Sequence, residues 1–262
     1  MGKFSVPVPM IDGTFYNVKT LLAKANANTK IYKSEKSGLG ITTVSLSLAP
    51  ASESGFNLCT SSSGPCREDC LYTSGRAAVH PRKIQPARIA KARMLRLYKD
   101  IFHQRLYDEM KLARKRANRK GLELYVRLNV LSDVMWEREF PQIFTGFSDV
   151  TFYDYTKHFK RMERYLSNGL PKNYHLTFSW AGPSNLEQCL YVLNHGGNVA
   201  IPFDTKRSKT LPQTWKGFTV VDGDVTDLRP LDPQGGYVIG LRAKGKARKD
   251  RNSGFVVRGV NS

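Results

Sequence analysis

Residues 149–156 read DVTFYDYT, and this short stretch shows the pattern from which the fold class can be predicted. β-Branched and aromatic residues dominate it, which is typical of a strand, and polar residues close it. Similar runs lie on both sides of it, at intervals long enough for a helix and two turns. Strands that alternate with helices predict parallel β-α units. The runs are GITTVSLSLAP (40–50), LELYVRLNV (122–130), DVTFYDYT, YHLTFSW (174–180), GNVAIPF (197–203) and GFTVVDG (217–223).

Six such units predict an α/β fold, either an incomplete (β/α)6 barrel of TIM-barrel type or a doubly wound sheet. A further stretch, GGYVIGLRAKG (235–245), is either a seventh strand or an edge hairpin. Because the sequence contains no linker and no repeat, we predict a single barrel domain at residues 41–258. Residues 1–40 are predicted to be an N-terminal extension.

Apolar residues recur at helical spacing between Pro86 and about Lys120, with Lys and Arg between them. This spacing predicts one long amphipathic helix or two shorter ones. The apolar positions are Ala90, Met94, Leu97, Ile101, Phe102, Leu106, Met110, Ala113 and Ala117.

Polar side chains gather where the predicted strands end. In parallel α/β folds the ligand site lies at the carboxyl ends of the strands, so we expect these side chains at one rim. Each of them alone is also typical of a turn or a helix cap. The candidates for a ligand pocket are Asp133, Asp154, Lys157 and Ser179, and Lys157 could pair with a carboxylate or a phosphate. His158 is the histidine that we expect near this rim.

Three of the four cysteines lie in one loop after the first predicted strand, in CTSSSGPCREDC (59–70). Four cysteines are too few for a disulfide scaffold in a chain of this length, which leaves metal binding or redox chemistry. Three thiolates suffice for a 4Fe-4S cluster that keeps one iron open, whereas a closed zinc site needs a fourth ligand. We therefore predict that Cys59, Cys66 and Cys70 bind an iron-sulfur cluster. Zinc with a remote fourth ligand and unligated thiols are the alternatives, and Cys189 is predicted to be a core residue.

The formal charge of +19 at pH 7 and the isoelectric point near 9.9 indicate an attraction to polyanions. Residues 82–120 hold fourteen Lys or Arg against three acidic residues, and RAKGKARKDR (242–251) is a second basic cluster. These residues either contact nucleic acid or form a solvated helix face and a basic tail. No apolar run is long enough to cross a bilayer and the first residues contain no apolar signal region, so we expect a cytoplasmic protein without a membrane partner.

Several of these motifs, in this order, resemble the phage and plasmid proteins of the gene product eighty-eight family. The similarity covers about residues 40–258 and implies a phage-encoded protein that binds a cluster in the host cytoplasm. It also implies that Cys59, Cys66 and Cys70 match the cysteines of the family. The motifs are VSLSLAP, the cysteine loop ending in CLY, VRLNVLSDVMWE, DVTFYDYTK, YHLTFSWAG and GYVIGLRAKG followed by GF.

The plan is also similar to the partial (β/α)6 barrel of radical S-adenosylmethionine enzymes, which hold a 4Fe-4S cluster on three cysteines after the first strand. This similarity implies S-adenosylmethionine as a ligand of the open iron. The spacing C-x6-C-x3-C differs from the usual C-x3-C-x2-C, and LSD (131–133) stands where those enzymes carry GGE.

Three hypotheses for the function follow. The first is an iron-sulfur protein with a radical-enzyme-like barrel, in which a small-molecule ligand meets the open iron. The second is a non-enzymatic nucleic-acid-binding or electron-transfer protein, in which the cluster is structural or redox-active and residues 82–120 contact phosphates. The third is a zinc-binding protein, which metal analysis would separate from the other two.

Overall fold

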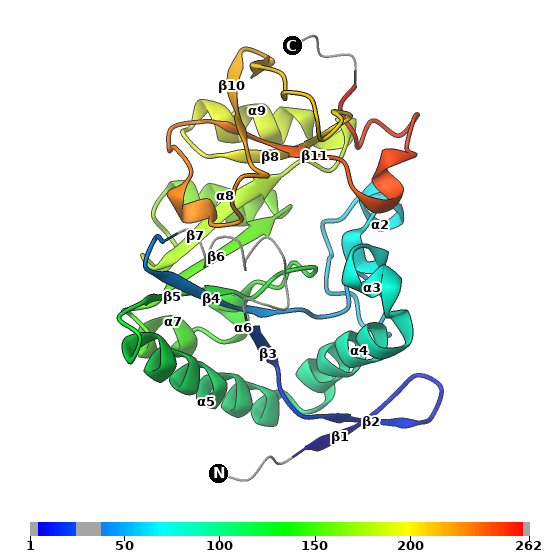
Figure 1. The fold of residues 1–262 in the computed structure, drawn as a ribbon, viewed down its shortest axis with the longest axis vertical. Coiled ribbons are helices and arrows are strands. Elements are labelled where there is room, and N and C mark those ends of the chain that lie inside the picture. Colours follow the sequence, from blue (N-terminus) through cyan, green and yellow to red (C-terminus); the bar gives the residue numbers. More distant parts are fainter. Residues whose placement is uncertain (1–4, 25–37, 259–262) are drawn as a thin grey trace. The chain divides into compact units, whose positions relative to one another are not determined.

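The chain is described by a computed structural model that covers residues 5–24 and 38–258. It divides into two compact units, each with strands and helices, whose elements are labelled in Figure 1. Unit 1 comprises residues 1–60 and 75–152, and unit 2 comprises residues 61–74 and 153–262.

All six runs predicted to be strands form strands, and so does the stretch at 235–245. They do so because β-branched and aromatic side chains pack well on the two covered faces of a parallel sheet. In β5, for example, four of the five residues are buried. The seven strands are β4 (Ile41–Leu46), β5 (Glu123–Arg127), β6 (Thr151–Thr156), β7 (Tyr174–Ser179), β8 (Val199–Phe203), β10 (Phe218–Asp222) and β11 (Val238–Arg242).

The sheet is mostly parallel, with an antiparallel strand at each outer position: β3 (Leu22–Lys24) and β9 (Thr214–Trp215). In unit 1 the strand order is β3-β4-β5-β6, and in unit 2 it is β6-β7-β8-β11-β10-β9, because β6 belongs in part to each unit. The strands from β4 to β8 therefore follow one another in sequence order. The protein is a mixed α/β fold with a large, mostly parallel sheet, which confirms the predicted class.

The stretch at 235–245 forms an internal strand. β11 pairs in parallel with β8 on one side and with β10 on the other, so the seventh-strand alternative is correct. The hairpin at this end of the sheet joins β9 to β10 through Lys216 and Gly217, whose φ angles are 51° and 86°. Two successive positive φ angles are typical of the type I′ turn, which matches the twist of a hairpin.

The predicted basic helix is two helices, α4 (Pro81–Leu97) and α5 (Lys99–Asn118), separated at Tyr98. Most of the predicted apolar positions are buried, but Leu97 and Ile101 are 42% and 51% exposed. Both flank the break, where the non-helical backbone of Tyr98 interrupts the continuous apolar face. The other helices are α2 (Gly64–Glu68), α3 (Arg76–Val79), α6 (Trp136–Glu139), α7 (Gln142–Gly146), α8 (Phe159–Leu166) and α9 (Leu186–Asn194), with short 3-10 helices at Leu71–Thr73, Pro183–Asn185, Arg229–Leu231 and Gly245–Arg248.

The first residues form structure of their own in unit 1. An antiparallel hairpin, β1 (Val6–Pro9) and β2 (Phe15–Val18), precedes β3, and β3 pairs with β4 at the edge of the sheet. The predicted N-terminal extension at 1–40 thus contains a hairpin and one strand of the sheet. Its residues 1–4 and 25–37 lie outside the described part of the chain.

Basic side chains of α4 and α5 hold this N-terminal segment through its backbone carbonyls. Arg93 Nε donates to the carbonyl of Pro9, and Arg105 donates to that of Val18 at 2.7 Å. Several of the cations predicted to contact nucleic acid are therefore engaged within the protein.

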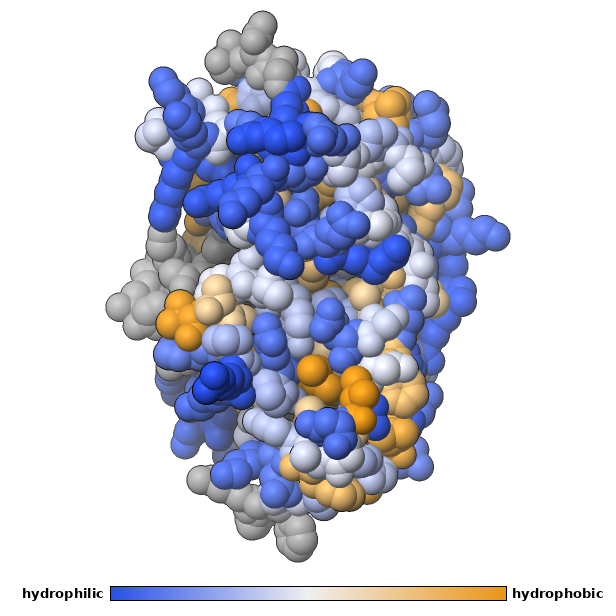
Figure 2. All heavy atoms as spheres, turned by 90° about the vertical axis from the view of Figure 1, so that its right-hand side faces the viewer, coloured by the Kyte–Doolittle hydropathy of each residue, from blue (hydrophilic) through white to orange (hydrophobic). Residues whose placement is uncertain are grey.

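In the described residues, none of the helices combines the length and the apolar character that crossing a bilayer requires. The face drawn in Figure 2 is mostly hydrophilic, with small apolar patches scattered over it. Isolated exposed apolar side chains of this kind are normal on protein surfaces.

Candidate functional site

The loop after β5 in unit 1 is organised by the side chain of Asn129, which is 2% exposed. Its Oδ1 accepts hydrogen bonds from the Ser132 hydroxyl at 2.9 Å, the Val134 amide at 3.0 Å and the Trp136 indole at 3.2 Å. Its Nδ2 donates to the Val134 carbonyl at 2.9 Å. A buried amide with its donors and acceptors satisfied fixes a single loop conformation.

Cys59 lies against this loop, at the carboxyl end of β5. Its Sγ donates to the Leu131 carbonyl at 3.5 Å, and its backbone amide donates to Asn57 Oδ1 at 2.9 Å. The Asp133 amide donates to the Leu58 carbonyl at 2.8 Å. Unit 1 therefore brings two predicted site residues, Cys59 and Asp133, to the same pair of loops.

The other two cysteines of the cluster belong to unit 2, in a segment attached to the ends of β6 and β7. Ser61 Oγ lies 2.7 Å from His158 Nδ1, just after β6, and Ser63 Oγ donates to the Ala181 carbonyl at 2.6 Å, just after β7. The Ser63 hydroxyl also accepts from the Cys66 amide at 3.1 Å, which makes Ser63 the N-cap of α2.

These contacts place the cysteine segment at the strand ends within unit 2. Cys66 lies in α2, Cys70 follows the C-cap residue of that helix, and both are thiols of intermediate burial. His158, the histidine expected near the rim, is in direct contact with this segment.

Lys157 and Ser179 face each other across the ends of β6 and β7. Lys157 Nζ donates to Ser179 Oγ at 2.8 Å, and both side chains are partly buried. The Ser179 carbonyl accepts from Asn185 Nδ2 at 3.2 Å, and Asn185 Oδ1 accepts from the Ala181 amide at 2.9 Å. A cation and a hydroxyl are thus held in fixed positions beside the segment that carries Cys66 and Cys70.

Asp154 differs from the other candidates because its side chain is fully buried. Its Oδ2 accepts a hydrogen bond from the Tyr174 hydroxyl at 2.7 Å, and Arg161 of α8 donates to the same hydroxyl at 2.7 Å. Asp154 therefore belongs to a buried polar network that joins β6, β7 and α8, as buried charges in proteins generally do.

Cys189 of α9 is fully buried, which confirms its predicted place in the core. Burial raises the pKa of its thiol to about 12, and nearby Lys157 opposes this shift. Its sulfur thus stays protonated at neutral pH, whereas metal ligands are thiolates.

Ser61, Ser63 and Asn185, which attach the cysteine segment and the end of β7, are not among the residues predicted from the sequence. A signal for Ser63 was present: a serine followed by Gly64 and Pro65 is typical of an N-cap with proline at the first helical position. The contacts of Ser61 and Asn185 depend on tertiary structure, so local sequence gave no signal for them.

The chemistry of the donors fits a cluster, because all three predicted ligands are free thiols of intermediate burial. Cys59 belongs to unit 1, whereas Cys66 and Cys70 belong to unit 2. Within residues 5–24 and 38–258, no three side chains of Cys, His, Asp or Glu are gathered as a metal site.

Comparison with protein families finds a match over residues 20–259 to the family described as Gene product 88. Neither the curated proteins nor the solved structures contain a match to this chain.

Proposed function

Since the chain belongs to the Gene product 88 family, and since its cysteine segments are attached to strand ends, we propose that it is an iron-sulfur protein. Cys59, Cys66 and Cys70 are the proposed ligands of a 4Fe-4S cluster. A cubane tolerates three protein thiolates and keeps one iron open for a further ligand. When bound, such a cluster supplies one-electron redox chemistry.

The observation that carries this proposal is the attachment of both cysteine segments to loops that follow parallel strands. Cys59 is held by the loop after β5, and the segment with Cys66 and Cys70 is held by residues after β6 and β7. Ligand sites of parallel α/β proteins lie at such strand ends. The sequential order of β4 to β8 is compatible with five strands of the proposed incomplete (β/α)6 barrel of the radical S-adenosylmethionine type, whereas β11 lies between β8 and the sixth predicted strand, β10.

The residues beside the thiols suit a small anionic or zwitterionic ligand. Lys157 supplies a positive charge that is oriented by Ser179, and a carboxylate is its natural partner. The Asp133 side chain, whose backbone is tied to Leu58, is the proposed partner of a ligand amine. S-adenosylmethionine carries both groups and is the ligand that we propose, in a phage-encoded protein acting in the host cytoplasm.

The test is anaerobic purification and reconstitution, followed by an absorption spectrum and by iron and sulfide analysis per chain. We expect a full 4Fe-4S complement for the wild type and a loss of most iron and sulfide in Cys59→Ala, Cys66→Ala and Cys70→Ala. Cys189→Ala is the matched control and should retain the cluster, because its sulfur is a core thiol.

A full cluster in Cys66→Ala would overturn the ligand assignment. Zinc without iron or sulfide would establish the zinc alternative instead. For the loaded protein, binding of S-adenosylmethionine that is insensitive to salt would support the small-molecule site, and Lys157→Ala should weaken it.

A further inference from the structure

The basic side chains of α4 and α5 divide into two groups with different surroundings. In α4 and the first half of α5, several cations are used within unit 1: Lys91, Arg93 and Arg105 donate to backbone carbonyls of the N-terminal segment. Arg96 and Lys99 pair with Glu139 at 3.1 Å and 3.0 Å.

In the second half of α5, Arg114 is the cation that makes an ion pair of this kind. The ten residues 111–120 include six Lys or Arg and no acidic residue. Arg114 pairs with Asp149 at 3.1 Å and covers the Phe147 ring. In the part of the chain that the structure describes, no ion pair engages the remaining cations of this stretch: Lys111, Lys115, Arg116, Arg119 and Lys120.

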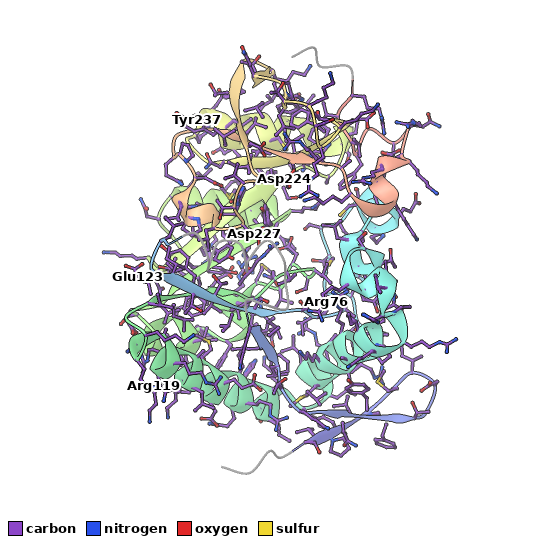
Figure 3. All side chains as sticks on the ribbon, viewed as in Figure 1. Arg76, Arg119, Glu123, Asp224, Asp227 and Tyr237 are labelled. Carbon is purple, nitrogen blue, oxygen red and sulfur yellow. The ribbon has the colours of Figure 1, made fainter. Side chains whose placement is uncertain are left out.

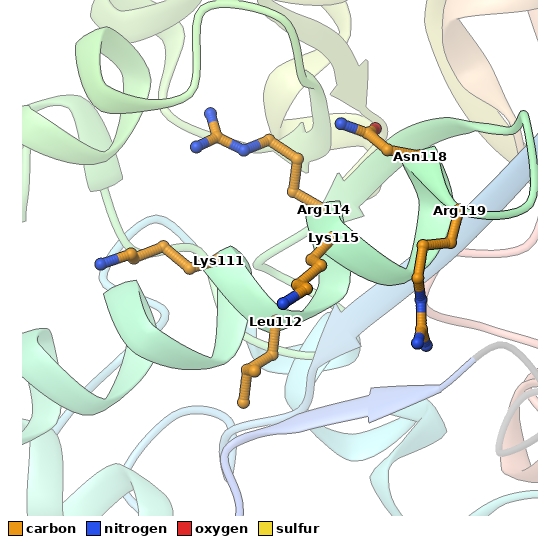
Figure 4. A pocket seen from close by; sticks show the side chains of 6 residues that line it. All are labelled: Lys111, Leu112, Arg114, Lys115, Asn118 and Arg119. Atoms are coloured by element: carbon orange, nitrogen blue, oxygen red, sulfur yellow. The ribbon is translucent and has the colours of Figure 1, made fainter. Parts of the chain in front are cut away.

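Lys111, Lys115 and Arg119 lie opposite the buried side of α5. The helix packs into unit 1 through Phe102, Leu106, Met110, Ala113 and Ala117, and the exposed side carries a shallow pocket of about 630 Å³. Figure 4 shows the lining side chains leaving the helix separately, and Arg119 is also labelled in Figure 3. The pocket is lined by Lys111, Leu112, Arg114, Lys115, Asn118 and Arg119.

The spacing of three of these cations matches a repeating polyanion. Lys111, Lys115 and Arg119 are four residues apart, so they form one row along the helix with a rise of about 6 Å between neighbours. Like charges at this spacing repel one another within a helix. The helix dipole favours cations in the last turn, but Lys111 lies two turns before the end of α5, where that effect has faded.

We infer that this face of α5 binds the phosphodiester backbone of nucleic acid. A row of three cations that have no ion-pair partner among the described residues follows successive phosphates of one strand, and Asn118 adds a neutral hydrogen-bond donor beside them. Leu112, 52% exposed, is the single apolar residue of the lining, whereas a membrane-binding helix presents a broad apolar face. This inference is independent of the proposed cluster.

The test measures binding of the full-length protein to a fluorescein-labelled DNA duplex and to the matching single strand by anisotropy, over a series of salt concentrations. The variant combines Lys111→Ala, Lys115→Ala and Arg119→Ala. The control combines Lys160→Ala, Lys172→Ala and Arg207→Ala, three exposed cations of unit 2 with the same change in charge.

We expect the slope of log affinity against log salt to fall by about three for the α5 variant and by much less for the control. Lys115→Gln alone should lower it by about one, which keeps the test decisive if the triple variant folds poorly. Equal losses in the two triple variants would overturn the inference. The inference would also be overturned if the α5 variant bound DNA as tightly as the wild type. It would equally be overturned if the variant lost binding to anionic lipid vesicles but kept its binding to DNA.

Discussion

His175 of β7 shows how one buried side chain couples this protein to pH. Its Nδ1 lies 3.1 Å from the Tyr165 hydroxyl, and burial, with a smaller effect of the Arg229 guanidinium, lowers its pKa from 6.5 to about 4. Between these two values the unfolded state takes up a proton that the folded state does not. The stability linked to His175 is therefore complete above pH 6.5 and is lost as the pH falls toward 4.

We expect urea denaturation to show a loss of at most roughly 3 kcal/mol from this group between about pH 7 and pH 4. His175→Gln can keep the contact with Tyr165 but does not titrate, so its stability should fall less over the same range. His195→Gln, at an exposed histidine, is the control and should follow the wild type. Parallel curves for wild type and His175→Gln would refute the coupling.

Single residues also show where local sequence is a sufficient guide. The burial of Cys189 was predictable, because its spacing within a helix pattern places it on an apolar side. The full burial of Asp154 was not, because it depends on the hydroxyl of Tyr174 and on Arg161, which come from two other elements. A polar residue near a strand end has the same neighbours in the sequence whether it lines a ligand pocket or belongs to a buried network in the core.

At the scale of the elements, the N-terminal segment is attached to α4 through Lys91 and to α5 through Glu109. Lys91 Nζ donates to the Leu21 carbonyl at 2.7 Å, and Glu109 accepts from the amides of Leu21 and Leu22 at 2.8 Å and 2.7 Å. Burial lowers the pKa of Lys91 to about 8, and Glu109 opposes the shift. One partly buried cation and one carboxylate thus hold the start of β3 in place.

Lys91→Met removes this donor and leaves the Leu21 carbonyl without it, which should cost about 1–3 kcal/mol. Hydrogen exchange of the amides in 15–24 should accelerate, while that of β5 changes little. Because the lowered pKa of Lys91 makes wild-type stability rise between about pH 8 and 10.5, the deficit of the variant should widen there. Lys111→Met, on the exposed side of α5, is the control; equally fast exchange in both variants would contradict the assignment.

At the scale of the elements, the positions of the strands in the sequence were easier to predict than the order of the strands in the sheet. Each apolar run was recognisable because its β-branched and aromatic residues are consecutive. The place of β11 between β8 and β10 was not recognisable, because strand order is decided by crossover connections and not by the strand sequence. Whether α4 and α5 form one helix or two was equally impossible to decide from the sequence, since the apolar spacing continues through Tyr98.

At the scale of the whole molecule, the dominant property is the formal charge of +19. A net charge far from zero opposes the compact state through self-repulsion, and this repulsion is reduced by salt. The ion pairs and cation-carbonyl contacts described above offset part of it locally. The uncompensated cations of residues 111–120 do not, so they should make the protein's stability depend on ionic strength.

We therefore expect the Tm of the wild-type protein to rise when sodium chloride is raised from about 50 mM to 300 mM, because the Debye length shortens from roughly 14 Å to 6 Å. The combination of Lys111→Ala, Lys115→Ala and Arg119→Ala should have a higher Tm at low salt and a smaller rise, since it removes three repelling charges from one row of α5. Lys160→Ala, Lys172→Ala and Arg207→Ala change the net charge equally but are widely separated in the sequence, so their low-salt gain should be smaller. If the two triple variants gain equally at low salt, net charge alone accounts for the effect, and the row on α5 carries no special repulsion. If salt lowers the Tm of the wild type, favourable ion pairs outweigh self-repulsion, and the excess charge is already compensated within the fold.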